Sequence, residues 1–193
     1  MTPEREKRIR DVLDRRQPDL TVVMDRVHKP HNLAAIARSC DAVGIAELNA
    51  VPLPGHATRL HRDKAASGAG KWLPMRKHAD IEAAYRYLRE QGMRIYVAHE
   101  CPEAIDFRAV DYTRPTAIAV GAELDGVSEE AIAGADGALA VPMQGMTRSL
   151  NVSVATAVIL YEAQRQREAA GYYETPRLSA EAREAIFRRW SEQ

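Results

Sequence analysis

The stretch LTVVMDRVHKPHNLAAIARSCDAVG, residues 20–44, holds the clearest structural signal in the chain. Residues 20–24 form a short apolar run that predicts a buried strand. Residues 31–43 predict a helix ended by Gly44, because apolar side chains recur at i, i+3, i+4 and i+7 and glycine is typical just past a helix. That apolar stripe consists of Leu33, Ile36, Ala37 and Cys40. A buried strand leading into a helix predicts a parallel α/β sheet.

The rest of the chain repeats this alternation. Further strands are expected at 46–51, 94–98, 116–120 and 138–141. Further helices are expected at 3–15, 80–91, from Ser128 onward, 149–169 and 180–190, whereas 55–71 is expected to be mostly loop. The helix 149–169 is expected to have Ser149 as its cap and Asn151 in its first turn, and to bury Leu150, Val154, Ala157, Val158 and Tyr161.

Ligands of parallel α/β sheets bind at the carboxyl ends of the strands. Three polar or glycine-rich segments follow expected strands, at 26–32, 121–126 and 143–149. Turns at such places are often polar for structural reasons alone. Their placement therefore indicates a site without identifying its chemistry.

Composition limits the class of protein. The chain has 193 residues, of which 46% are hydrophobic and 28% charged, which is typical of a globular domain rather than a disordered chain. No apolar run approaches the ~18 residues of a membrane helix, and the charged N-terminus lacks the apolar core of a signal peptide. Two cysteines cannot make a disulfide or zinc framework. We therefore expect a cytoplasmic protein without a membrane partner.

Charge is balanced overall, with 27 Lys and Arg residues against 27 Asp and Glu residues. This balance argues against nucleic-acid binding through the overall field, but it allows a local basic patch. Between His56 and His78, six cations stand against a single acidic residue. The cations are Arg59, Arg62, Lys64, Lys71, Arg76 and Lys77. The stretch is interpreted either as a solvated loop or as a surface that contacts phosphates.

One face of the helix 31–43 is polar. His31, Ala35 and Arg38 share this face at i, i+4 and i+7, opposite the apolar stripe. Asn32 stands at the helix start, where free backbone N–H groups favour an anion. Arg38 is therefore either an ordinary solvent-facing cation or a residue that acts on a bound phosphate or carboxylate.

Several familiar catalytic motifs are absent from the sequence. The segment GAELDG, residues 121–126, is not a GxGxxG fingerprint, and neither a P-loop nor a GxSxG motif occurs. His28 and His31 flank a proline and make only a weak metal pair, so no metal is expected. Cys40 lies on the apolar stripe, which indicates a buried structural thiol.

Three segments together resemble the SpoU (TrmH) family of SPOUT RNA 2'-O-ribose methyltransferases. Residues 27–44 are similar to the first family motif and residues 120–128 (VGAELDGVS) to the second. Residues 141–143 (VPM) and 145–153 (GMTRSLNVS) are similar to the third. The segments occur in the family's order and spacing, and the similarity covers nearly the whole chain.

The resemblance implies the SPOUT fold, a parallel α/β sheet with a deep C-terminal trefoil knot, flanked by terminal helices. It implies one methyltransferase domain over residues 1–193, with helices at about 1–16 and 178–193 as extensions. It also implies a homodimer, tRNA as the partner and S-adenosyl-L-methionine as the methyl donor. The similarity is greatest to members that methylate the ribose 2'-hydroxyl of guanosine 18 in the tRNA D-loop.

The resemblance assigns roles to individual residues. The side chains that would carry the chemistry are Asn32, Arg38, Glu123, Ser149 and Asn151. The residues that would contact the cofactor are Ala98, Gly121, Val141, Met143 and Leu150. The residues that would contact RNA are Arg8, Arg15, Arg16, His31, Arg59, Arg62, Lys64, Arg165 and Arg167.

Methyl transfer from a sulfonium to a hydroxyl requires alignment of the two groups and removal of a proton. The resemblance assigns the proton-accepting role to Arg38, helped by the substrate phosphate. Because arginine rarely gives up its proton, Arg38 is alternatively interpreted as holding the phosphate and stabilising the developing alkoxide. Two other functions stay open: methylation at another tRNA site or in rRNA, and RNA binding by a knotted protein without catalysis.

Overall fold

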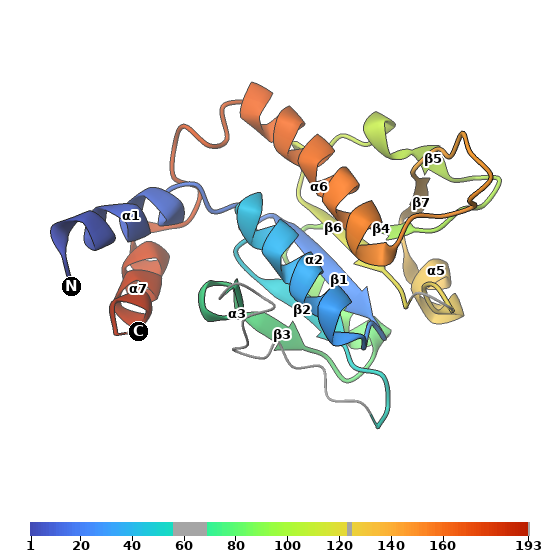
Figure 1. Ribbon diagram of the computed structural model, residues 1–193, viewed down its shortest axis with the longest axis horizontal. Helices are drawn as coiled ribbons and strands as arrows, with labels where there is room; N and C mark the ends of the chain where they lie inside the picture. The colour runs from blue at the N-terminus through green and yellow to red at the C-terminus, as the bar shows by residue number, and fades with distance from the viewer. Residues whose placement is uncertain (56–68, 123–124, 193) are drawn as a thin grey trace.

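The computed structural model, shown in Figure 1, describes residues 1–55, 69–122 and 125–192, which form a parallel sheet with flanking helices. The strands are β1 (Leu20–Asp25), β2 (Leu48–Val51), β3 (Met75–Lys77), β4 (Arg94–Ala98), β5 (Ile105–Asp106), β6 (Thr116–Val120) and β7 (Gly137–Ala140). The helices are α1 (Pro3–Leu13), α2 (Pro30–Ala42), α3 (Ala69–Trp72), α4 (Ile81–Glu90), the 3₁₀ helix η2 (Phe107–Ala109), α5 (Glu129–Gly134), α6 (Val152–Ala169) and α7 (Ala180–Ser191). Each predicted strand and helix is present; β4 and β6 have the predicted ends, and the other elements have at least one shifted end.

All neighbouring strands of the sheet are parallel, in the order β3-β2-β1-β6-β4-β7-β5. β1 pairs with β2 through Val23 and Asn49, and with β6 through Leu20 and Thr116. All six residues of β1 are buried. The carboxyl ends of β1, β6, β4 and β7 therefore meet at one edge of the sheet, where the polar segments found in the sequence follow them.

The edge strands β3 and β5 are not predicted by the sequence. They are three and two residues long, and most of their side chains are exposed. Such short runs lack the apolar alternation that predicts a strand.

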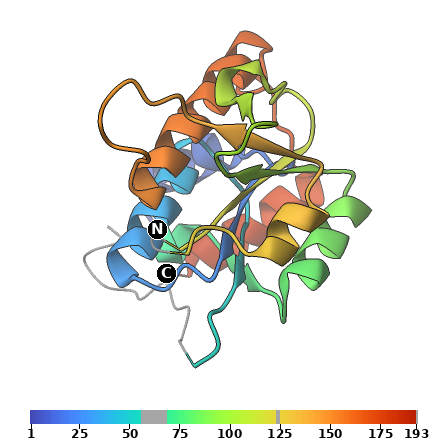
Figure 2. The ribbon, with the colours of Figure 1, turned by 90° about the vertical axis from the view of Figure 1, so that its right-hand side faces the viewer.

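Helices cover both faces of the sheet (Figure 2). α2 and α6 pack together on one face, in a core that includes Ile36 and Ile159. α4 and α5 cover the other face, where Tyr85 and Leu88 are buried. Cys40 lies in the first core, where burial raises the pKa of its thiol well above the ordinary value, consistent with a structural role.

The start and the inner face of α6 differ from the prediction. Asn151 rather than Ser149 caps the helix, because the helix begins at Val152. Val154 and Tyr161 were expected in the core but are 48% and 53% exposed. The helix is apolar on two faces, and the face that packs on the core carries Thr156, Ile159, Leu160 and Ala163. No helix within the described ranges combines the length and apolarity needed to cross a membrane.

The terminal helices α1 and α7 pack against each other at one end of the molecule, with the two chain ends close by (Figure 1). Their shared cluster contains Ile9, Leu13, Phe187 and Trp190. Trp190 also meets the ring of Trp72 edge-on, with centroids 5.3 Å apart, which connects the helix pair to α3.

Candidate active site

A cavity of about 200 Å³ opens where β4, β6 and β7 end, beside the start of α6. Its lining includes all five residues that the resemblance assigns to the cofactor, Ala98, Gly121, Val141, Met143 and Leu150. Ser149 lines it as well. The structure therefore brings together residues from three strand ends that are far apart in the sequence.

The loop after β6 is folded back tightly on itself. A Cβ atom at Gly121 would lie 2.0 Å from the backbone carbonyl of Gly126, so only glycine fits there. The N–H of Gly126 donates to the carbonyl of Ala122 over 2.9 Å and closes the turn. The N–H of Ser128 donates to the buried Asp25 carboxylate over 2.7 Å, which ties the loop to the end of β1. Glu123 lies outside the described residues.

The cavity is lined by buried apolar side chains and by two exposed charged residues. Val120, Leu139 and Ile159 are buried side chains of its lining. Glu100 and Arg148 are exposed and also line it. The sequence prediction missed these two residues, although a charged residue just past the expected strand 94–98 was a signal for Glu100.

Two asparagines join the starts of α2 and α6. Nδ2 of Asn151 donates to Oδ1 of Asn32 over 3.3 Å. Oδ1 of Asn151 accepts from the backbone N–H of Ser153 over 2.9 Å and so caps α6. Asn32 is only 1% exposed, and its Nδ2 has no hydrogen-bond partner among the described residues. A buried amide donor without a partner is costly, so this atom points to a bound group.

Arg38 and His31 lie on the exposed face of α2, as predicted. In the part of the chain that the structure describes, neither side chain has a hydrogen-bond or ion-pair partner. Because an unpaired guanidinium costs little in solvent and binds phosphate in a bidentate manner, Arg38 is available for a polyanionic substrate.

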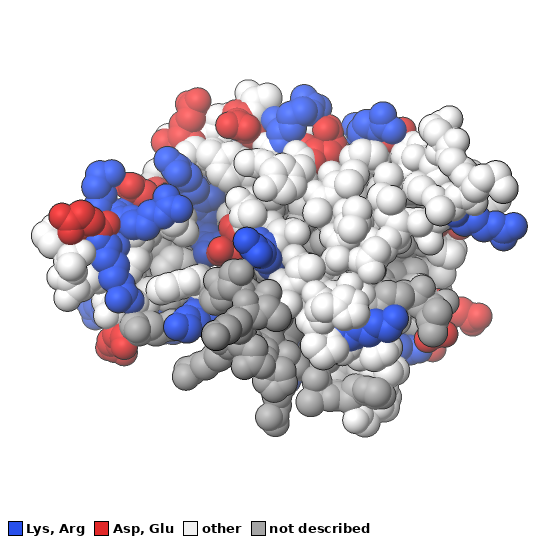
Figure 3. Space-filling model, viewed as in Figure 1, with Lys and Arg blue, Asp and Glu red and all other residues white. Residues whose placement is uncertain are grey.

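Six further candidate RNA contacts divide into three groups. Arg8 on α1 and Arg15 in the turn after it are exposed, in a region where cations gather over α1 and α7 (Figure 3). Arg165 is exposed on α6 and donates two hydrogen bonds to the Glu162 carboxylate, the shorter over 2.8 Å. These hydrogen bonds lower the pKa of Glu162. The third group, Arg59, Arg62 and Lys64, lies outside the described residues.

The resemblance assigns Arg16 and Arg167 to RNA contact, but both side chains are buried and bound within the protein. Arg16 is 2% exposed and donates to Asp41 over 2.6 Å and to the carbonyl of Ile45 over 2.8 Å. Arg167 is 0% exposed and donates to Asp19 over 2.6 Å. Burial alone would raise the pKa of Asp19, but hydrogen bonds and charge from Arg167 and Arg177 outweigh it and lower that pKa.

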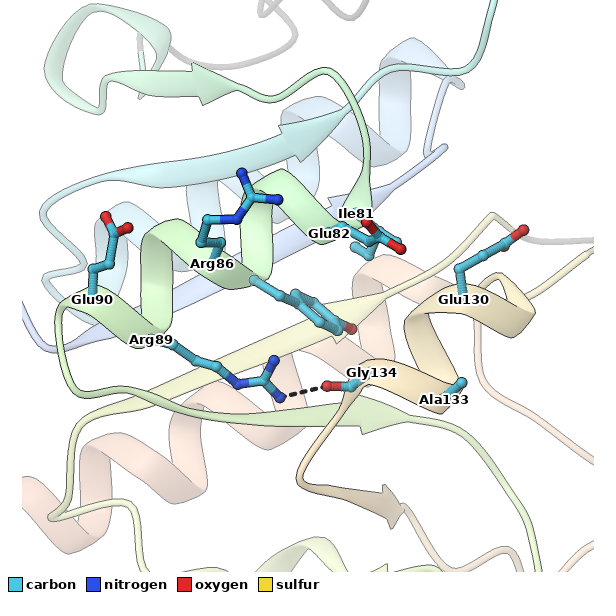
Figure 4. Close-up of a pocket in the computed structure, with 9 residues that line it drawn as sticks. Ile81, Glu82, Arg86, Arg89, Glu90, Glu130, Ala133 and Gly134 are labelled. Atoms are coloured by element: carbon cyan, nitrogen blue, oxygen red, sulfur yellow. Dashed lines mark hydrogen bonds between the residues drawn. The ribbon is translucent and has the colours of Figure 1, made fainter.

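A larger cavity, of about 810 Å³, lies between α4 and α5 on the opposite face of the sheet (Figure 4). Arg89 crosses it and donates to the carbonyl of Gly134 over 2.6 Å. Its other charged side chains, which include Arg86 and Glu90, do not converge on one point (Figure 4). None of the predicted site residues lines it, and within the described ranges no cluster of His, Cys, Asp and Glu side chains could hold a metal ion.

Comparison with known proteins adds to this geometry. The model of the SpoU rRNA methylase family matches residues 19–161. The tRNA (guanosine(18)-2'-O)-methyltransferase of Thermus thermophilus is 52% identical over 189 residues, covering 98% of this chain and 96% of the relative. The crystal structure of the A. aeolicus TrmH/SpoU tRNA modifying enzyme is similar with a TM-score of 0.92 at 42% identity, covering 98% of this chain and 95% of that one. The SpoU methyltransferase AviRb from Streptomyces viridochromogenes, in complex with the cofactor AdoMet, is similar with a TM-score of 0.69 at 27% identity, covering 81% and 59% of the two chains. With a family match over more than half of its length and a relative of 52% identity, the chain belongs to the SpoU rRNA methylase family.

Proposed function

We propose that this protein transfers the methyl group of S-adenosyl-L-methionine to the ribose 2'-hydroxyl of guanosine 18 in the tRNA D-loop. The observation that carries the proposal is the cavity lined by Ala98, Gly121, Val141, Met143 and Leu150, next to Ser149 and the start of α6. The Thermus thermophilus relative carries this activity in its name, and it is similar over nearly its whole length.

The residues present fit this cofactor. The glycine at 121 leaves backbone, rather than a side chain, at the cavity wall, which suits the close approach of a flat ring. The buried apolar side chains Val120, Leu139 and Ile159 suit its adenine. When bound, the cofactor supplies an electrophilic methyl group on a sulfonium.

The protein side chains then align the acceptor and manage its proton. Arg38 holds a phosphate of the substrate and stabilises the alkoxide that develops on the 2'-oxygen, because arginine remains protonated in proteins. The methyl group of the bound cofactor would pass to the 2'-oxygen and leave S-adenosylhomocysteine, and the hydroxyl proton would pass to solvent water. Asn32, held in place by Asn151, offers its Nδ2 to the substrate, and Ser149 lies at the cavity wall. Glu123, which lies outside the described residues, stays a candidate for the chemistry.

The RNA would lie across exposed cations of several elements. Four exposed side chains are suited to phosphate contacts: Arg8 on α1, Arg15 in the turn after α1, His31 on α2 and Arg165 on α6. Arg59, Arg62 and Lys64, which lie outside the described residues, are further candidates for phosphate contacts. A tRNA substrate places the reaction in the cytoplasm.

The active form would be a homodimer. Val154 and Tyr161 are spaced seven residues apart on α6, so they share one face, and about half of each side chain is exposed. A second copy of the chain would bury this apolar face. Residues 1–193 would form one domain with α1 and α7 as extensions, and the trefoil knot of the family is part of the same proposal.

The test is methyl transfer from labelled S-adenosyl-L-methionine to an unmodified tRNA transcript, with the modified nucleotide mapped. Label on the 2'-oxygen of guanosine 18 supports the proposal. Label at another tRNA position or in rRNA would keep the reaction and overturn the target. Cofactor binding without transfer to any RNA would indicate a binding protein without catalysis.

A further inference from the structure

The cofactor cavity carries two charged side chains of opposite sign, Glu100 and Arg148. Glu100 follows β4 closely, and the backbone N–H of His99 donates to the carbonyl of Leu139 over 3.1 Å, which fixes this position beside β7. Arg148 lies in the segment between β7 and α6. Both side chains are exposed and both line the cavity. In the ranges that the structure describes, neither has a hydrogen-bond or ion-pair partner.

The size of the cavity limits how much of a ligand it encloses. Its volume is about 200 Å³, below the ~300–1,000 Å³ typical of pockets that enclose a whole ligand. Its buried walls are apolar, and its charged residues are exposed. A ligand with one flat apolar end and one charged end would therefore place the flat end inside and the charged end at the opening, beside Glu100 and Arg148.

We propose that Arg148 and Glu100 bind the amino-acid end of the cofactor, the guanidinium on its α-carboxylate and the Glu100 carboxylate on its α-ammonium. This rests on the proposed function, which supplies a cofactor with a zwitterionic end. Two opposite charges at one opening match a zwitterion, whereas a neutral or singly charged ligand would leave one of them without a partner. The two residues set the affinity for the intact cofactor and take no part in the chemical step.

Two stable analogues of the cofactor measure how much its amino-acid end contributes to binding, apart from its adenosine. S-adenosylhomocysteine and 5'-methylthioadenosine share the adenosine and the thioether sulfur, and only the first has the carboxylate and the ammonium. We expect the parent protein to bind the first more tightly in calorimetric titration. Arg148→Gln and Glu100→Gln should each weaken S-adenosylhomocysteine binding about five-fold, the size of a partly exposed ion pair, and leave methylthioadenosine binding unchanged.

Matched controls lie outside the cavity. Glu103→Gln is an exposed acid three residues from Glu100, and Arg86→Gln is an exposed cation on the opposite face of the sheet. Both should bind the two nucleosides like the parent. The proposal is overturned if the cavity variants weaken both nucleosides equally, which would indicate a disturbed pocket or contacts to the ribose, or if they weaken neither. If the parent binds neither nucleoside, the proposed function itself fails, a result distinct from the others.

Discussion

Nδ2 of Asn151 donates to Oδ1 of Asn32 over 3.3 Å, which links the starts of two helices that are 119 residues apart. The contact fixes which way the Asn32 amide faces. Its Oδ1 is occupied by the protein, and its Nδ2 is left as a buried donor without a partner in the described part of the chain. The capping residue of α6 thus also determines what α2 offers to a substrate.

The first prediction tests this link through Asn151→Asp. A carboxylate caps a helix as well as an amide, so the melting temperature should stay near that of the parent. The new carboxylate cannot donate a hydrogen bond to Asn32. The Asn32 amide would then turn so that its Nδ2 faces this carboxylate and no longer faces the substrate. We expect single-turnover methyl transfer to fall at least ten-fold, measured beside thermal unfolding. Asn151→Ala, which also loses the cap, should in addition lower the stability by about 1 kcal/mol. A parent-like rate in Asn151→Asp would show that the orientation of Asn32 does not matter.

Arg38→Ala should slow methyl transfer by about 100-fold or more, the loss typical when an electrostatic partner of the transition state is removed. Cofactor affinity should be unchanged, because Arg38 is not among the residues that line the cavity. Unfolding should also be unchanged, because Arg38 is exposed. Labelled methyl transfer and calorimetric cofactor titration measure the two effects. Arg86→Ala on the opposite face is the control. If Arg38→Ala kept its turnover, both interpretations of this residue would be wrong.

The sequence predicts the central strands and the amphipathic helices because their apolar patterns are local. It predicts the cofactor residues through resemblance, and the structure brings them to one cavity. It fails where the outcome depends on distant partners. The resemblance assigns Arg167 to RNA contact, but the side chain is buried against Asp19, which precedes β1. The helical spacing of Tyr161 predicts a core position, but α6 turns another face inward.

Gly121→Ala should disable the cavity. The added Cβ would meet the backbone of Gly126 at 2.0 Å, and backbone cannot move aside as a flexible side chain can. Overpacking of this kind costs about 1–3 kcal/mol, and here it also displaces the loop that lines the cavity. We expect a lower melting temperature and loss of cofactor binding. Gly145→Ala is the matched control, because its Cβ would meet nothing within 4 Å among the described residues. Normal cofactor binding by Gly121→Ala would contradict the tight loop.

Tyr161→Glu tests the proposed dimer. The side chain is 53% exposed, so a charge there should leave the fold of one chain intact, whereas burying that charge against a second copy would be costly. We expect sedimentation to show a shift from dimer to monomer. Ile132→Glu on α5 is the control, since Ile132 is also exposed, at 36%, but lies on the other face of the sheet. A dimer that tolerates Tyr161→Glu would have to use another surface.

The last prediction concerns Asp19, whose carboxylate holds Arg167 and Arg177, each over 2.6 Å. The pKa of Asp19 is lowered in the folded protein, because hydrogen bonds and charge from these arginines outweigh the effect of burial. Because the pKa of Asp19 is lower in the folded than in the unfolded protein, ionisation of this carboxyl stabilises the fold. This contribution is complete at a pH above the unfolded pKa of about 3.9, and it is lost as the pH falls through the folded pKa. Asp19→Asn lacks the contribution at every pH. We therefore expect the variant to be about 2 kcal/mol less stable at pH 7.

Below a pH of about 4, the difference between the two proteins should shrink, because the parent then loses the same contribution. Urea unfolding of both proteins from pH 7 to pH 2.5 measures this difference directly. Glu103→Gln, an exposed acid outside this network, should stay close to the parent across the range. A difference that stays constant down to pH 2.5 would mean that the substitution disturbs packing rather than removing a charge from the two arginines.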